Sequence, residues 1–575
     1  MSDQSNRSNM FAFADGYVEA EAVRHPVFAT YIGVSGYDDR LDDFSMDGVR
    51  ESRDAVRHAL SALETIEVSG FADRVAHAVM TERLGAITGL LEGFEMVTTV
   101  SVINSPVGEV RQVFELMPTT SADDAQVIRR RLDAVEGAMS SWREGLDEAA
   151  DAGHVAPRRH ALGIADQAAL HADGSYAAFA RRVADECGVD FEESGLSGAA
   201  TVAQDALGET GVWLREEYAP RCRETDAAGP DRYALWSSYY SGTEVDFDEL
   251  YSWGVEELHR IHDRMVNLGQ RLAPAATSLV DVADVLDRDD AGAVVGEDAL
   301  LARLESFIEG AVSTLNGVHF DIDPRVQRCD ARIAPEGSAA APYYIGASED
   351  LTRPGTTWFP TMRATRFPWW RIASTWYHES VPGHHLQDAT IVLRRDELSR
   401  FQRSMAWTSG VGEGWALYAE RFMDELNAFS PADEFGYLSG QALRAVRIVV
   451  DLGLHLGYPI PDGYDDALGE TGIAGQRWTP ERAVALVERW AIEPHDYAVS
   501  EVDRYLGVPG QAIAYKLGER TWMSVRDDAR QRLASAFDLK GFHAAALGIG
   551  PMGLAPFVDL MGRWRGGDNF AESER

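Results

Sequence analysis

Apolar residues recur at steps of three and four through most of this chain, with charged residues between them. That period is typical of amphipathic α-helices, so the pattern predicts a mostly α-helical protein. The clearest predicted helices lie at 46–68, 72–97, 122–150, 247–273 and 298–315. Clusters of Asp, Gly and small residues predict loops at Glu224–Pro230 and Asp281–Asp298.

One short stretch, Ala341–Pro360, departs from the helical pattern. It reads APYYIGASEDLTRPGTTWFP, with aromatic pairs on either side of Pro354 and Gly355. Aromatic runs that flank a Pro-Gly turn predict a small β-hairpin. The hairpin lies directly upstream of the segment that carries the most candidate chemistry.

The length and composition are those of a folded protein. The chain has 575 residues, of which 45% are hydrophobic, and this excludes a disordered tail protein. Such a length suits a handful of domains or one large helical domain. We find no internal repeat or low-complexity tract, and we expect a single large helical domain over 1–575, with its candidate chemistry at about 340–520.

The charge of the chain excludes two classes of partner. With 53 basic and 92 acidic side chains, its formal net charge is −39. A chain this acidic repels phosphate backbones and anionic lipids, so we expect no nucleic-acid and no membrane partner. Lys516 and Lys540 are the two lysines, the other basic residues being arginine. Life at high salt and an arginine-favouring genome both explain this composition.

Cysteine usage and the first residues predict the location. Cys187, Cys222 and Cys329 are widely spaced and form no CxxC pair, which argues against a disulfide framework and a thiolate zinc site. Met1–Arg7 is polar and leads into no apolar core, and no uninterrupted apolar run reaches transmembrane length. We therefore expect a cytoplasmic protein, of an oligomeric state that these patterns do not predict.

The segment Trp376–Asp388, WYHESVPGHHLQD, contains a His-Glu pair followed by further histidines. In zinc hydrolases the second histidine comes four residues after the first, on the same helix face. Here Pro382 takes that position, while His384 points away and His385 lies roughly 10 Å along the axis from His378. An undistorted helix therefore cannot place two imidazoles about 2 Å from one zinc ion.

Pro382 and Gly383 supply the distortion that such a site needs. Pro382 lacks the N–H that would bond to the carbonyl of His378, and Gly383 can adopt backbone angles closed to other residues. Two residues can bulge out, which brings His384 to the place one turn from His378. We favour His384 as the second ligand and keep His385 as a supporting or substrate-facing residue. The alternative is a kinked core helix with incidental histidines.

A third metal ligand is expected downstream, since a catalytic zinc takes three protein ligands and keeps one position open. In the segment Ser409–Arg421, SGVGEGWALYAER, Glu413 stands between two glycines, 29 residues after His384. Small neighbours would let its carboxylate approach a crowded site. Glu420, on roughly the same helix face, is the rival ligand or an orienting partner. A glycine-flanked Glu is also common at an ordinary helix start.

A polar stripe crosses the otherwise apolar predicted helix Arg444–Gly457. It consists of Arg444, Arg447, Asp451 and His455, at steps of three, four and four. One interpretation is an internal ladder that pairs Arg447 with Asp451. In the other, Asp451 orients a ligand, His455 donates to the oxyanion, and the arginines hold a substrate carboxylate.

The segment Tyr505–Gly518, YLGVPGQAIAYKLG, supplies further candidates. Tyr505 or Tyr515 could donate its phenolic proton to a tetrahedral intermediate. Lys516 is a candidate for substrate binding in a chain that otherwise uses arginine. A helical tyrosine is also common as a core residue with a satisfied hydroxyl.

The blocks HESVPGHHLQ, EGWALYAE, RAVRIVVDLGLH and PGQAIAYKLG together resemble the bacterial domain-of-unknown-function 885 family. The segments HPVFATYIGVSGYDDRLDDFS and RPGTTWFP fit too, so the resemblance spans nearly the whole chain. Members resemble thermostable-carboxypeptidase-like and thimet-oligopeptidase-like zinc peptidases, which are large helical proteins with a deep central groove. The resemblance therefore implies a metallopeptidase-like helical fold with such a groove.

The resemblance also implies roles for individual residues. Two histidines of the His-Glu helix and a Glu of a following helix hold the metal in those peptidases, which gives His378, His384 and Glu413 as ligands of Zn²⁺. Glu379 is then the general base. Two extra residues in the His-Glu helix depart from the peptidases and leave the choice between His384 and His385 open.

We expect a zinc-dependent metallopeptidase that cleaves short peptides. Glu379 would take a proton from the attacking water, and His455, Tyr505 or Tyr515 would stabilise the oxyanion. The edge of the hairpin could pair with an extended peptide. The alternatives are a zinc hydrolase of a small non-peptide amide or ester, and a non-catalytic helical scaffold with a vestigial metal site. Exo- and endo-cleavage both stay open.

Overall fold

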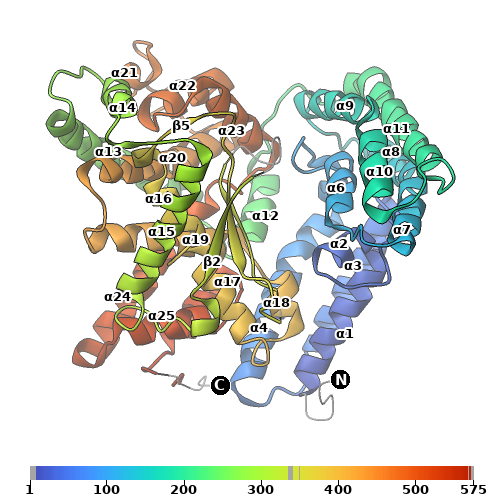
Figure 1. Ribbon diagram of the computed structural model, residues 1–575, viewed down its shortest axis with the longest axis horizontal. Helices are drawn as coiled ribbons and strands as arrows, with labels where there is room; N and C mark the ends of the chain where they lie inside the picture. The colour runs from blue at the N-terminus through green and yellow to red at the C-terminus, as the bar shows by residue number, and fades with distance from the viewer. Residues whose placement is uncertain (1–7, 335–340, 349, 568, 572–575) are drawn as a thin grey trace. The chain divides into compact units, whose positions relative to one another are not determined.

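The structure is a computed structural model that describes residues 8–334, 341–348, 350–567 and 569–571. Helices make up most of it, with a few short strands (Figure 1). The predicted mostly α-helical class is confirmed. Where the sequence leads us to expect one domain, the contacts divide the chain into two compact units. Unit 1 takes in the described residues of 1–68, 84–235 and 506–509, and unit 2 those of 69–83, 236–505 and 510–575.

Unit 1 consists of helices packed around one apolar core. Its helices are α1 (Asn9–Arg24), α2 (Pro26–Tyr31), α3 (Met46–Leu63), α5 (Glu95–Thr98), α6 (Pro106–Val113), α7 (Ala122–Asp133), α8 (Val135–Asp151), α9 (Arg158–Ala172), α10 (Ser175–Cys187) and α11 (Leu196–Trp213). The division between the units falls inside α4 (Gly70–Glu92), α12 (Pro230–Ser241) and the end of α23 (His495–Gly507). Leu132 of α7, Trp142 of α8 and Leu207 of α11 are among the fully buried core residues.

A single buried arginine holds the amino-terminal segment of unit 1. The guanidinium of Arg131, on α7, donates to the carbonyl oxygens of Arg40 and Pro26 at 2.9 and 3.0 Å. It also donates to the hydroxyl of Thr30 at 2.9 Å. All three acceptors belong to the segment HPVFATYIGVSGYDDRLDDFS. This part of the family resemblance therefore follows from the packing of unit 1 around a buried charge.

Unit 2 contains the remaining helices and all the strands of the described residues. Its helices are α13 (Phe247–Leu272), α14 (Leu279–Arg288), α15 (Glu297–Leu315), α16 (Ala373–Glu379), α17 (His384–Leu393), α18 (Arg400–Met405), α19 (Ser409–Glu425), α20 (Pro431–Leu456), α21 (Asp465–Leu468), α22 (Pro480–Trp490), α23 (His495–Gly507), α24 (Ala514–Leu533), α25 (Leu539–Gly548) and α26 (Leu554–Gly562). Its strands are β1 (Ala293–Val295), β2 (Cys329–Ile333), β3 (Tyr343–Ile345), β4 (Gly355–Phe359) and β5 (Arg366–Pro368).

The strands form two small sheets, one of which contains the predicted hairpin. β3 runs antiparallel to β4, with Tyr343 opposite Trp358, which confirms the hairpin, although Gly355 of the predicted turn is the first residue of β4. On the other side of β4, β2 pairs in parallel, with Cys329 opposite Gly355, giving the order β2-β4-β3. β1 and β5 pair separately. The parallel strand β2 was not expected, because no local turn signals a pairing across so many residues.

Three predictions of local structure need correction. The predicted helix 72–97 is interrupted at Gly93 and Phe94, between α4 and α5. The predicted loop Asp281–Asp298 is partly helical, since α14 continues to Arg288 and α15 already begins at Glu297. Ser278 and Asp281 form a capping box at the start of α14, whose apolar face is buried. The predicted helix 122–150 is interrupted at Ala134, so that α7 and α8 are separate helices. The predicted loop Glu224–Pro230 does precede α12.

Three helices of unit 2, α19, α20 and α24, carry most of the candidate chemistry. The Thr408 hydroxyl caps α19 by accepting the N–H of Val411, and Ser430 caps α20 in the same way. α19 and α24 cross closely, because a Cβ at Gly518 would lie 2.0 Å from the carbonyl oxygen of Gly410. This close crossing sets the position of Glu413, which lies one turn beyond Gly410.

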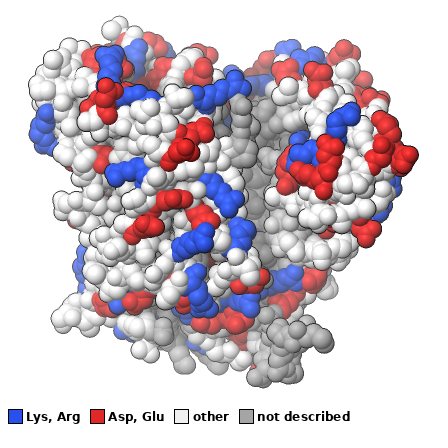
Figure 2. Space-filling model, viewed as in Figure 1, with Lys and Arg blue, Asp and Glu red and all other residues white. Residues whose placement is uncertain are grey.

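Acidic and basic side chains are interspersed on the face shown in Figure 2. In unit 2, for example, Arg264 of α13 donates to both carboxylate oxygens of Asp424 and also to Glu434. The arginines are thus drawn into ion pairs with the more numerous carboxylates. No helix in the described part of the chain combines the length and the apolar character that a bilayer crossing requires.

We expect Arg131→Met to destabilise unit 1 by about 1–3 kcal/mol, because it removes three hydrogen bonds from buried or partly buried acceptors. Urea and thermal unfolding, followed by circular dichroism, measure the effect.

The matched control is Arg130→Met. Arg130, the residue before Arg131, is exposed and pairs with Asp39 at 3.2 Å. Surface pairs contribute about 0–1 kcal/mol, so this variant should unfold nearly like the parent. Equal destabilisation by the two substitutions would contradict the role given to Arg131.

Candidate active site

A pocket of about 890 Å³ in unit 2 gathers most of the candidate residues. It is lined by Ala341, Pro342, Tyr343, Tyr344, Met362, Thr375, His378, Glu379, His384, Asp388, Trp407, Glu413, Leu443, Arg444, Arg447, Glu493, Pro494, Asp496, Tyr497, Ser500 and Tyr515. These residues come from α16, α17, α19, α20, α23, α24 and the hairpin strand β3. This pocket does not test whether the protein has a deep central groove, which stays a prediction.

The His-Glu helix is broken where the sequence predicts a distortion. α16 ends at Glu379 and α17 begins at His384. The N–H of Gly383 donates to the carbonyl of Tyr377, six residues back instead of the four of an α-helix, at 3.1 Å. Two residues have thus left the helical path. The indole N–H of Trp415 donates to the carbonyls of Pro382 and Gly383 at 3.0 and 3.1 Å and holds the turn.

Close packing of the backbone also requires glycine at position 383. Its φ is −74°, so no left-handed conformation is involved. A Cβ at this position would lie 1.9 Å from the carbonyl oxygen of His378 and 2.5 Å from that of Tyr377. The backbone packs on itself here, and only a residue without a side chain fits.

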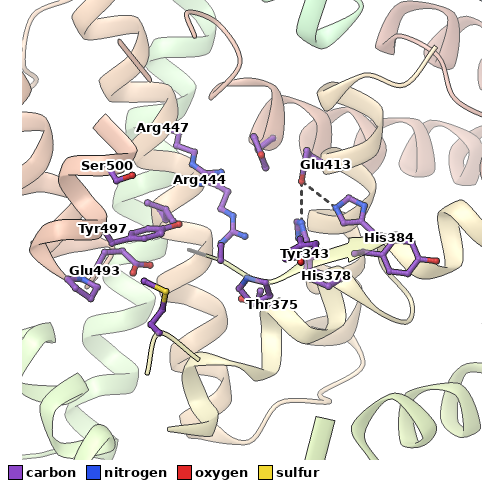
Figure 3. Close-up of a pocket in the computed structure, with 18 of the residues that line it drawn as sticks. Tyr343, Thr375, His378, His384, Glu413, Arg444, Arg447, Glu493, Tyr497 and Ser500 are labelled. Atoms are coloured by element: carbon purple, nitrogen blue, oxygen red, sulfur yellow. Dashed lines mark hydrogen bonds and ion pairs between the residues drawn. The ribbon is translucent and has the colours of Figure 1, made fainter. Parts of the chain in front are cut away.

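The turn brings two histidines to one carboxylate. Figure 3 shows His378 and His384 pointing at Glu413 from α16 and α17. The Nε2 atoms of the histidines lie 3.2 and 3.6 Å from Oε2 of Glu413, and the candidate ligand atoms all lie within 4.8 Å of one another. In a tetrahedral zinc site with bonds of about 2.0–2.1 Å, ligand atoms lie about 3.3–3.5 Å apart. The two His-Glu separations match this spacing, so the donor set is compatible with a metal ion.

The other face of His378 is held by Glu420, the predicted rival ligand. Nδ1 of His378 donates to Oε1 of Glu420 at 2.8 Å, and the same carboxylate accepts from the Ser374 hydroxyl and lies 3.8 Å from Arg444. Glu420 is thus an orienting partner. Burial lowers the pKa of His378, but the carboxylates of Glu413 and Glu420 outweigh it and raise the pKa to about 10. A metal cation bound at Nε2 would neutralise the Glu413 carboxylate, as the proton on Nε2 does in the protonated imidazole.

The glycines beside Glu413 have separate packing reasons. A Cβ at Gly412 would lie 2.5 Å from the indole nitrogen of Trp407, and one at Gly414 would lie 2.6 Å from the backbone of Gly518. Burial acts to raise the pKa of Glu413, yet hydrogen bonds from His378 and His384 hold it well below its usual range. Glu413 is therefore an anion set into a crowded helix crossing.

Glu379, the predicted general base, is buried and lines the same pocket. Burial raises the pKa of its carboxyl, against the opposing effect of His378 and His384. A raised pKa makes a carboxylate a better proton acceptor. Its position beside the ligand set is what a base acting on water there requires.

His385 does not line the pocket, which corrects the expectation that it faces the substrate. The Tyr344 hydroxyl donates to its Nδ1 at 3.0 Å, and its Nε2 donates to the carbonyl of Val326 at 2.8 Å. Both ring nitrogens are therefore used, and burial lowers the pKa of His385. Gly355 permits this contact, because a Cβ there would lie 2.1 Å from the Tyr344 hydroxyl. His385 ties α17 to the hairpin.

Of the three predicted oxyanion donors, the pocket contains Tyr515 alone. Tyr505 is buried outside the lining, where its hydroxyl donates to Glu501 at 2.6 Å. His455 is also buried and donates from Nε2 to the carbonyl of Tyr505 at 3.0 Å. Both expectations are corrected, because each donor is already committed to a partner. Tyr515 interacts electrostatically with Glu413, and this interaction, with burial, raises its pKa.

Lys516 and Asp451 also lie outside the pocket lining. The Lys516 ammonium is buried, contacts Gln441 and Glu519, and lies 3.2 Å from Glu257, so it is not available to a substrate. Asp451 accepts the N–H of Gly510 at 3.1 Å and orients no metal ligand. Arg447 does form a buried ion pair, but not with Asp451 as the predicted ladder required.

Arg447 has another ion-pair partner than the predicted one. It pairs with Glu501 at 2.7 Å, not with Asp451, and it lines the pocket together with Arg444. The two arginines of the stripe therefore face the pocket, while Asp451 and His455 serve the packing behind it.

One wall of the pocket contains residues that the sequence did not predict. Glu493, Tyr497 and Ser500 line it from α23 and the residue stretch before it. Their spacing of four and three is that of one helix face, but no motif marks it. Burial raises the pKa of Glu493 to about 7. Asp388 was missed too, although it follows His384 by one helical turn; burial raises its pKa to about 6.

One known protein family matches most of the chain. A family described as "Bacterial protein of unknown function (DUF885)" matches residues 26–561. The chain belongs to the DUF885 family. No curated protein matches this member of the family.

Two solved structures share the fold of this DUF885 protein. One is "the putative lipoprotein from Colwellia psychrerythraea", with 20% identity, a TM-score of 0.81 and coverage of 97% of this chain and 99% of that chain. The other is "a putative lipoprotein of unknown function from Shewanella oneidensis", with 18% identity, a TM-score of 0.74 and coverage of 96% and 100%. At these identities the likeness shows the fold alone.

We expect Gly383→Ala to lower the stability of unit 2 by at least about 1–3 kcal/mol, because its Cβ must displace backbone atoms. The thermal midpoint of the purified protein measures this loss. Gly310→Ala is the control, since Gly310 lies on α15 with no atom within 4 Å of its added Cβ. Alanine at that helical position should be neutral or stabilising, by up to about 1 kcal/mol. Two equal midpoints would contradict the packing argument.

Proposed function

We propose that this DUF885 protein is a zinc-dependent metallopeptidase that hydrolyses short peptides. One observation carries the proposal: His378, His384 and Glu413 present their ligand atoms within 4.8 Å of one another, in a pocket that also holds Glu379. Two histidines and one carboxylate, with an open fourth position, form a donor set typical of catalytic zinc.

The residues around this donor set have complementary tasks. Bound zinc would supply the Lewis acidity that activates a water molecule and polarises a carbonyl group. Glu379 takes the proton of the attacking water and returns it to the leaving amine. Tyr515 donates its phenolic proton in a hydrogen bond to the carbonyl oxygen as that oxygen gains charge. Glu420 keeps the proton of His378 on Nδ1, which leaves Nε2 free to act as a ligand.

Two features favour a peptide over a small amide or ester. β3 is an edge strand that pairs with β4 on one side, and its Tyr343 lines the pocket. An extended peptide can add to the other side of such a strand. Trp407 and Met362 line the pocket while 49% and 69% exposed, and they offer apolar surface to a substrate side chain. A cytoplasmic location stays a prediction.

A peptide-library digest with the zinc-loaded protein tests the proposal directly. The products are identified by mass spectrometry, before and after dialysis against a chelator. Cleavage that is lost with the metal and restored by zinc supports a metallopeptidase. Hydrolysis of amide or ester reporters without any peptide cleavage would favour the non-peptide hydrolase, and no turnover of either class would favour a vestigial site.

We expect Glu379→Gln to retain one zinc ion per chain and to lower peptide turnover by about 10²–10⁴-fold, because the amide cannot accept the proton. Zinc content by mass spectrometry and kcat on a library-derived peptide measure the two effects. Glu397→Gln, at an exposed glutamate outside the pocket, is the matched control and should keep both. Full activity of the Glu379 variant would exclude it as the base.

The two adjacent histidines should differ in their effect on metal binding. His384→Ala removes a proposed ligand and should abolish stoichiometric zinc binding. His385→Ala leaves the Tyr344 hydroxyl and the Val326 carbonyl without partners, so it should lower the thermal midpoint while the folded protein still binds zinc. Zinc titration of both variants distinguishes them. The reverse result would make His385 the ligand.

A further inference from the structure

Arg447 has a hydrogen-bonding group that the protein leaves unused. Its Nε and Nη2 donate to Glu501 at 3.1 and 2.7 Å, and its guanidinium lies over the ring of Tyr515, 4.5 Å from the centroid. The side chain is thus fixed. Its Nη1 is buried and has no hydrogen-bond partner among the described residues, although the side chain lines the pocket. A buried donor without a partner costs free energy, so a ligand acceptor would stabilise it.

The charges around Arg447 favour an anionic ligand. Glu501 is shared between Arg447 and Arg504, which pairs with it at 3.0 Å, so one carboxylate serves two guanidinium groups. Arg444, the other arginine of the pocket, donates to the carbonyl of Gly440, and its Nε has no partner in the described part of the chain. Glu420 lies 3.8 Å from Arg444, so Arg447, which shares Glu501 with Arg504, is the guanidinium at this end with the least carboxylate to itself.

Glu493 faces these arginines across the pocket, and Asp496 from the same segment also lines it. In the view of Figure 3, Arg444 and Arg447 lie between Glu413 on one side and Glu493, Tyr497 and Ser500 on the other. Glu493 interacts electrostatically with both arginines, but burial holds its pKa near 7. At neutral pH it therefore offsets only part of their charge.

Tyr515 connects the positive end of the pocket to the ligand set. It interacts electrostatically with Glu413 and packs against the guanidinium of Arg447. Both groups face the same pocket, so one substrate can contact the two ends.

We propose that Arg447, with Arg444 beside it, binds the terminal α-carboxylate of the substrate, so that the enzyme is a carboxypeptidase that releases one C-terminal residue. This inference rests on the proposed function and adds its mode of cleavage. A guanidinium with one free N–H edge suits a carboxylate. In the reaction, the oxygen of water bonds to the last internal carbonyl carbon and the C–N bond breaks. The proton held by Glu379 then passes to the amino group of the released residue.

A pair of peptides that differ only at the carboxyl terminus tests the proposal. The probes are acetyl-alanyl-alanyl-phenylalanine with a free carboxylate and the same peptide as its C-terminal amide. We expect the zinc-loaded full-length protein to cleave the free acid with a kcat/KM about 100-fold or more above that of the amide. Arg447→Lys keeps a positive charge for Glu501 but loses the free donor, and it should bring this ratio below about 10.

Arg504→Lys is the matched control. Arg504 also pairs with Glu501, yet it does not line the pocket, so its substitution should leave the ratio of the two substrates unchanged. A general loss of structure would lower the activity on both peptides alike and would show in the thermal midpoint. Calorimetric binding of the two uncleaved peptides to Glu379→Gln gives a second measurement, in which only the free acid should bind tightly.

The outcomes separate this inference from the function on which it rests. Equal cleavage of acid and amide, or internal cleavage of longer library peptides, would overturn the carboxypeptidase and leave the metallopeptidase standing. An unchanged ratio in Arg447→Lys would overturn the role of Arg447. No cleavage of any peptide by the zinc-loaded protein would overturn the proposed function itself.

Discussion

The backbone turn between α16 and α17 is the constraint on which the candidate site depends. Gly383 lies so close to the carbonyl of His378 that no Cβ fits, and its N–H bonds six residues back. Two residues leave the helix, and both His378 and His384 can then reach Glu413. Trp415 donates to the carbonyls of the turn from the same helix that carries Glu413. One helix therefore stabilises the turn and supplies the third group of the site.

The spacing of two glutamates on α19 organises the next layer of contacts. Glu413 and Glu420 are seven residues apart, about two turns, so they share a face and hold opposite nitrogens of His378. Charges buried this deeply are tolerated only when each has partners. Ser374 and Arg444 are those partners for Glu420, and Arg444 connects the histidine to the arginine end of the pocket.

The pocket joins two electrostatic environments that the overall charge does not suggest. One end presents a carboxylate and two imidazoles, a donor set for a cation. The other presents guanidinium groups of which Arg447 has a free donor. A peptide fits this polarity, since its carbonyl oxygen needs a positive centre and its terminal carboxylate needs another. Net charge leads us to expect no nucleic-acid or membrane partner, while the local arrangement of charge favours the ligand that we propose.

The sequence alone determined the helical class and the hairpin, and it offered His378, His384 and Glu413 as candidates while His385 and Glu420 stayed open as rivals. The helical class and the hairpin follow from local rules, namely periodicity and turn residues, and Pro382 and Gly383 indicated where the helix would be distorted. Only the tertiary structure decided that Arg447 pairs with Glu501 and that His455 and Lys516 are enclosed by partners away from the pocket. Helix periodicity shows which residues share a face, but the groups packed against that face come from segments far along the chain.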